Sequence, residues 1–121
     1  MELEGLRVLL VEDESLVAMA VEDMLHDLGC EVAATAGSVP EALERLQVGG
    51  FDFALLDVNL ANQQVFPVAE ALSEQRIPFA FASGYGAANL PEAFRARPVA
   101  AKPFQIADLA ATLSAALAAE R

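Results

Sequence analysis

Four short apolar segments of the chain end in residues whose side chains could handle phosphate together with a metal ion. Glu12 and Asp13 follow the first of these segments, Asp57 the second, Ser83 the third and Lys102 the fourth. If the segment ends converge, three carboxylates and one ammonium share a small cleft, which is costly unless a cation is present. A hard divalent ion such as magnesium prefers oxygen ligands and keeps several waters. The spacing therefore predicts a magnesium site where phosphoryl chemistry could take place.

The ligands of that predicted magnesium ion can be assigned from their positions. Asp13 and Asp57 are expected as direct ligands, and Glu12 is expected to act through a bound water. The main-chain carbonyl of Asn59 is expected to complete the protein's contribution, because one or two carboxylates and a carbonyl suffice for magnesium.

The remaining chemistry centres on Asp57, which lies where a buried strand is expected to meet a loop and could attack a phosphoryl group as a carboxylate nucleophile. Lys102 would supply a second positive charge opposite the metal, and Ser83 would hydrogen-bond a phosphoryl oxygen. Taken singly, such residues are more often solvated strand ends, turn residues or surface charges. Their occurrence together at successive strand ends is much harder to attribute to chance.

The elements that must position these groups follow from the alternation of two apolar periods. Continuous apolar runs predict buried strands, and apolar residues at helical spacing predict amphipathic helices between them. Strands are expected over residues 6–11, 31–36, 53–56, 78–82 and 99–101, and helices from Ser15 to Gly29, from Ser38 to about Val48, over 65–72, from near Asn89, and over 106–117. The result is an α/β three-layer sandwich with a five-stranded parallel sheet of flavodoxin-like order 2-1-3-4-5 and five helices, of which the fourth could be short.

Composition excludes several other classes of protein. The 121 residues suit one domain, and 55% are apolar, which is enough for a substantial core. A formal charge of −11 disfavours direct contact with nucleic acid, and no apolar run approaches the ~20 residues that membrane insertion needs. Cys30 is the single cysteine, which excludes an internal disulfide and is typical of a cytoplasmic protein.

Four motifs in the chain resemble the signatures of response-regulator receiver domains, the CheY-like family of two-component phosphorelays. They are Val-Leu-Leu-Val-Glu-Asp-Glu, Ala-Leu-Leu-Asp-Val-Asn-Leu, Ala-Ser-Gly-Tyr and Ala-Lys-Pro-Phe. The resemblance covers essentially residues 1–121 and implies a receiver without an output domain. It implies that Asp57 is the phosphoacceptor, that a histidine kinase or histidine phosphotransfer protein is the donor, and that the bond between Lys102 and Pro103 is cis. Such a domain catalyses only its own phosphorylation and dephosphorylation, and signals to a downstream protein target.

A finer resemblance involves the residues around Ser83. The segment from Pro78 to Gly86 is similar to the FAT GUY group of receivers, with serine in place of the usual threonine. Many receivers carry an aromatic switch residue three positions before the lysine, where this chain has Val99. The resemblance therefore suggests that Tyr85 partly replaces that switch, and that its bulk slows the water that removes the phosphoryl group.

Other interpretations remain open at this stage. A haloacid-dehalogenase-like phosphatase would also use a strand-end aspartate, but it requires a second acidic residue two positions later, where this chain has Asn59. A pseudo-receiver would keep the fold as a docking module that works without phosphorylation. A true receiver could bind a target when phosphorylated or pass the phosphoryl group onward, and it could be a natural single domain or part of a hybrid kinase. His26, within the first expected helix, is a poor candidate for a phosphodonor.

Overall fold

A computed structural model of the protein describes residues 3–60, 63–84 and 90–119. The elements in chain order are β1 (Arg7–Val11), α1 (Ser15–Asp27), β2 (Glu31–Ala36), α2 (Val39–Val48), β3 (Phe53–Asp57), β4 (Asn59–Leu60), β5 (Gln63–Gln64), α3 (Phe66–Glu74), β6 (Phe79–Ser83), a 3-10 turn (Glu92–Phe94), β7 (Val99–Ala101) and α4 (Ile106–Ala119). None of the described helices is both long and apolar enough to span a bilayer.

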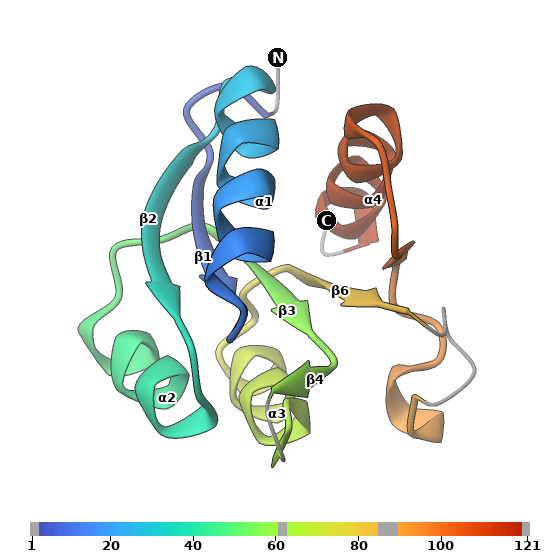
Figure 1. Cartoon of the computed structure of the whole chain (residues 1–121). Coiled ribbons are helices and arrows are strands. Elements are labelled where there is room, and N and C mark those ends of the chain that lie inside the picture. The colour runs from blue at the N-terminus through green and yellow to red at the C-terminus, as the bar shows by residue number, and fades with distance from the viewer. Residues whose placement is uncertain (1–2, 61–62, 85–89, 120–121) are drawn as a thin grey trace.

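The main sheet has five strands in the order β2-β1-β3-β6-β7, and every neighbouring pair is parallel. Helices α1 and α4 cover one face, and α2 and α3 cover the other (Figure 1). Because β4 and β5 form a separate antiparallel hairpin, the five sheet strands have the predicted order 2-1-3-4-5. The predicted α/β three-layer fold is confirmed, whereas the hairpin was not expected.

The two faces of the sheet are filled by alternating residues of the central strands. On β1, Val8 and Leu10 pack with the core of α1 and α4, while Leu9 and Val11 pack with the core of α2 and α3. All four side chains are buried. Successive side chains of a strand point to opposite faces, so an unbroken apolar run is what a strand covered on both faces requires.

The fourth predicted helix is wrong for the part of the chain that the structure describes. Its expected start near Asn89 lies outside the described residues, and the segment after it holds a single 3-10 turn, Glu92–Phe94. Pro91 lies directly before this turn, and Pro98 disfavours a helical conformation at the residue before it. Too few residues remain between the two prolines for a stable α-helix.

The 3-10 turn is attached to the core by one aromatic ring. Phe94 is buried and lies 5.8 Å from Phe81 and 5.9 Å from Phe66, measured between ring centroids. Arg97 places its guanidinium carbon 4.5 Å from the centroid of the Phe79 ring. Aromatic packing and the contact of Arg97 with Phe79 therefore hold this turn against the core.

Candidate functional site

The site lies at the carboxyl edge of the sheet, where neighbouring parallel strands end together. Asp57 is paired with Ala82, the residue before Ser83, and Ser83 is paired with Ala101, the residue before Lys102. The main-chain N–H of Lys102 donates to the carbonyl of Ser83 at 2.8 Å. The register thus brings the predicted residues from β1, β3, β6 and β7 to one edge of the molecule.

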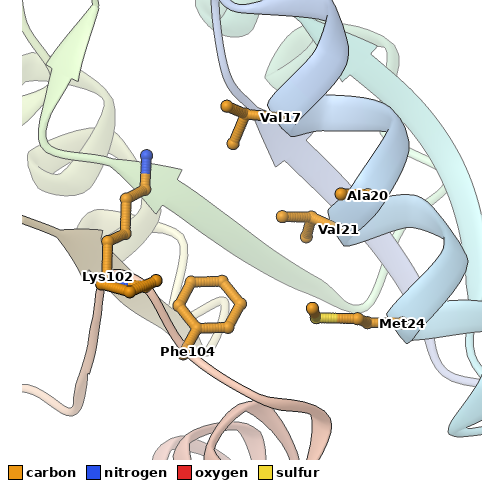
Figure 2. A pocket seen from close by; sticks show the side chains of 7 residues that line it. Val17, Ala20, Val21, Met24, Lys102 and Phe104 are labelled. Atoms are coloured by element: carbon orange, nitrogen blue, oxygen red, sulfur yellow. The ribbon is translucent and has the colours of Figure 1, made fainter.

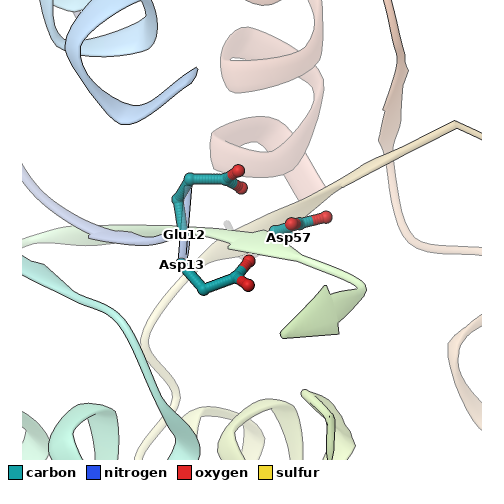
Figure 3. A group of neighbouring side chains, drawn as sticks. All are labelled: Glu12, Asp13 and Asp57. Atoms are coloured by element: carbon teal, nitrogen blue, oxygen red, sulfur yellow. The ribbon is translucent and has the colours of Figure 1, made fainter. Parts of the chain in front are cut away.

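Three carboxyl groups gather at this edge. Glu12, Asp13 and Asp57 each place one carboxylate oxygen within 4.8 Å of the others (Figure 3). Glu12 is buried, Asp57 is half-buried and Asp13 is exposed, so the cluster runs from the interior to solvent. Oxygen ligands graded in this way suit a hard cation that keeps part of its water shell.

Lys102 contacts two of these carboxylates directly. Its Nζ lies 3.3 Å from Oδ1 of Asp57 and 3.4 Å from Oε2 of Glu12. The contact with Asp57 agrees with the expectation that Lys102 lies close to this aspartate. The contact with Glu12 fits the expectation that the ammonium shares a cleft with the carboxylates, although the sequence did not indicate which carboxylates it would touch.

Glu12 is the electrostatically strained member of the cluster. Its Oε1 is buried and has no hydrogen-bond partner among the described residues. Burial, followed by the hydrogen bond and the charge of Asp57, raises the pKa of Glu12 from 4.5 to about 8, and Lys102 offsets only part of this rise. Lys102 contacts two of the three clustered carboxylates, so among the described residues the donor set fits a site that takes a further cation.

The other predicted site residues are placed as follows. Ser83 is buried at the end of β6, Val99 begins β7, and Asn59 begins β4 two residues after Asp57. The peptide bond between Lys102 and Pro103 is cis, as the resemblance implied. Tyr85 lies outside the described residues, and its expected role stays a prediction.

The model of the response regulator receiver domain family matches residues 8–114 of the chain. The chain belongs to this family. Receiver domains are in general signalling domains rather than enzymes, and they interact with kinases or phosphotransfer proteins and with downstream targets.

Solved structures and curated proteins agree with this assignment. SdrG from Sphingomonas melonis Fr1 is 43% identical, with a TM-score of 0.84 over 97% of this chain and 99% of that one. The receiver domain of PhyR from Erythrobacter litoralis is 30% identical, with a TM-score of 0.82 over 97% and 93% of the two chains. The transcriptional regulatory protein PdtaR of Mycobacterium tuberculosis is 33% identical over 109 residues, which are 85% of this chain and 52% of PdtaR. The receiver thus spans about half the length of the curated relatives that it matches first.

An apolar groove of about 330 Å³ opens beside the acidic cluster of this receiver. We call it the α1 groove; its lining residues are Val17, Ala20, Val21, Met24, Lys102, Pro103 and Phe104. Figure 2 shows the Phe104 ring facing Val21 and Met24 across the groove. Lys102 therefore takes part in both the groove and the acidic cluster.

Two exposed apolar side chains extend the apolar surface on α1. Leu16 is 81% exposed and Met19 is 60% exposed. Sequence reasoning did not identify this surface, although one signal was available. Leu16 and Met19 fall outside the buried stripe of Ala18, Val21 and Leu25, so α1 carries more apolar residues than its core face uses.

Proposed function

We propose that this receiver takes a phosphoryl group onto Asp57 in a magnesium-dependent reaction, with a histidine kinase or a histidine phosphotransfer protein as donor. The observation that carries the proposal is the position of Asp57, which contacts Lys102 at 3.3 Å and belongs to a cluster of three carboxylates. A nucleophilic carboxylate beside a fixed cation and a potential metal site is what phosphoryl transfer to aspartate requires.

The reaction exchanges one bond to phosphorus for another. An oxygen of Asp57 forms a bond to the phosphorus, the bond from phosphorus to the imidazole nitrogen of the donor breaks, and the released imidazole takes up a proton. Lys102 already lies against Asp57, so its ammonium can neutralise charge on the incoming oxygens. Ser83, at the end of the neighbouring strand, is the proposed donor to a phosphoryl oxygen.

The proposed magnesium ligands are Asp13 and Asp57 directly, Glu12 through a water, and the main-chain carbonyl of Asn59. The buried Oε1 of Glu12 and the excess of carboxylate over ammonium support a cation at this position. When bound, magnesium supplies positive charge that screens the carboxylates and polarises the phosphoryl oxygens. The chain's own part is to hold these oxygens at one strand edge.

The α1 groove is the proposed docking site for the phosphodonor, whose complementary surface would be an apolar helix. Lys102 lines one end of the groove and touches Asp57, so a helix bound there would bring its phosphohistidine next to the acceptor. The exposed Leu16 and Met19 would add apolar contact area. An apolar contact also suits a protein of formal charge −11, which repels acidic partners.

The proposed output is a protein contact or onward transfer of the phosphoryl group. Phosphorylated Asp57 would carry new acceptor oxygens, which would favour conformations that bring Ser83 and Lys102 toward them. A pseudo-receiver that acts only as a docking module is the alternative function. It would keep the α1 groove but would accept no phosphate.

Intact-protein mass spectrometry after incubation with acetyl phosphate and magnesium tests the proposal. The wild type is expected to gain one phosphoryl group, Asp57→Asn none, and Asp27→Asn, which changes an exposed aspartate of α1, the same as the wild type. Chelation of magnesium should abolish the adduct. A wild type that gains no adduct from acetyl phosphate or from a phosphohistidine donor would refute the proposal and favour the docking module.

A further inference from the structure

The chain forms a small antiparallel hairpin directly after the phosphoacceptor strand. Asn59 pairs with Gln64, Leu60 pairs with Gln63, and the N–H of Val65 donates to the carbonyl of Val58 at 3.2 Å. Antiparallel ladders alternate between hydrogen-bonded and non-hydrogen-bonded residue pairs. Val58 and Val65 form a hydrogen-bonded pair, so the next pair, Asn59 with Gln64, is not hydrogen-bonded. The main-chain carbonyl of Asn59 is therefore not used by the hydrogen bonds between the two strands.

One side of this hairpin is fixed by apolar packing. Leu60 is 1% exposed and belongs to the core shared with α2 and α3, as do Val58 and Val65. The N–H of Val58 also donates to the carbonyl of Ala82 on β6 at 3.1 Å. Strands of two residues have almost no stability of their own in water, so contacts from outside the hairpin must set its position.

The other side is held by Gln63, which reaches the start of α2. The N–H of Val39, the first residue of this helix, donates to Oε1 of Gln63 at 3.4 Å. The first N–H groups of a helix lack partners within the helix. Ser38 satisfies one of them by accepting from the N–H of Glu41 at 3.2 Å, and Gln63 satisfies another from a separate part of the chain. Gln63 is therefore a helix cap supplied by the loop that follows the phosphoacceptor.

We propose that Gln63 is a positioning residue for the metal site: by joining the hairpin to α2 it fixes the main-chain carbonyl of Asn59 as a magnesium ligand. This inference rests on the magnesium site of the proposed function. Leu60 of β4 pairs directly with Gln63 of β5, so each strand has an anchoring residue at the same position along the hairpin. Loss of the polar anchor leaves the hairpin held by the apolar packing of Val58, Leu60 and Val65, so the position of β5 and of the neighbouring Asn59 carbonyl is less closely fixed.

The test is a magnesium titration of the full chain, in which binding is monitored by amide chemical shifts in NMR spectra. Unfolding of the metal-free chain in EDTA measures its stability separately. Gln63→Ala should raise the magnesium dissociation constant about threefold, since one hydrogen bond of this kind is worth a factor of about two to ten. Gln63→Glu keeps the acceptor at a helix start and should bind magnesium within about twofold of the wild type. Gln64→Ala changes the other exposed glutamine of β5 and should bind like the wild type.

A second signal does not involve the metal. In EDTA, the amide proton of Val39 should move upfield in Gln63→Ala and stay near its wild-type position in the other two variants. Wild-type affinity in Gln63→Ala, or equal weakening in Gln63→Glu, would overturn the positioning role and leave the proposed function intact. A wild type that binds no magnesium would overturn both the proposed metal site and this inference.

Discussion

Replacement of Glu12 by glutamine should stabilise the metal-free protein at high pH and not at low pH. Burial and the adjacent Asp57 raise the pKa of Glu12 from 4.5 to about 8 in the folded chain. This folded-state pKa lies above the unfolded one. The contribution of protonated Glu12 to the free energy of unfolding is therefore fully present below pH 4.5 and is lost as the pH rises through about 8. A glutamine side chain would resemble the protonated glutamate and would carry no such loss.

The size of the effect follows from the same linkage. One pKa unit corresponds to about 1.4 kcal/mol, so a rise from 4.5 to about 8 would cost the wild type on the order of 3 kcal/mol between pH 5 and pH 8. The ammonium of Lys102 opposes this rise in the pKa of Glu12 but offsets only part of it.

Urea unfolding in EDTA, followed by far-ultraviolet circular dichroism, measures the difference, since the chain has no tryptophan for fluorescence. The quantity to compare is the free energy of unfolding of Glu12→Gln minus that of the wild type. This difference should be about 3 kcal/mol larger at pH 8 than at pH 5. Glu44→Gln, which removes an exposed glutamate of α2, controls for the loss of one negative charge. Magnesium in excess should restore most of the wild-type stability at pH 8. A difference between Glu12→Gln and the wild type that does not change with pH would refute the reasoning.

Two further predictions concern α3 and the α1 groove. Arg76 follows α3 with a φ of 58°, in the place that Gly29 occupies after α1. Arg76→Gly should therefore raise the free energy of unfolding in urea by about 1 kcal/mol, because glycine adopts this conformation without strain. An equal gain in Arg76→Ala would contradict this explanation. Leu16→Glu should reduce kcat/KM for transfer from a phosphohistidine donor about tenfold, through lost apolar contact and added negative charge. Its phosphorylation by acetyl phosphate should stay as in the wild type, and an equal fall with both donors would argue against docking at the groove.

Most of the fold could be predicted because its signals are local and periodic. The run from Glu31 to Ala36 and the pattern of Ser38 and Glu41 mark β2 and the start of α2, and the N–H of Glu41 does donate to Ser38. The Glu41 carboxylate accepts from the N–H of Gly37 rather than from that of Ser38. The hairpin could not be predicted, because the segment from Asn59 to Gln64 has neither β-branched residues nor alternation.

The candidate site divides in the same way. The residue types at the strand ends predicted which groups would meet, since parallel strands end at one edge of the sheet. The pairing of Lys102 with Glu12 and the burial of the Glu12 carboxylate depend on how side chains pack around that edge. The α1 groove depends on the close approach of α1 to Phe104, which no local pattern records.

The order of strands in the sheet also governs when the site can exist during folding. Glu12 follows β1 and Asp57 ends β3, which are neighbours near the centre of the sheet, whereas Lys102 follows β7, an edge strand and the last of the described strands along the chain. A nascent chain without β7 therefore holds its acidic groups without their lysine. Under the proposed function, we therefore expect phosphorylation of Asp57 to require that β7 has docked onto β6.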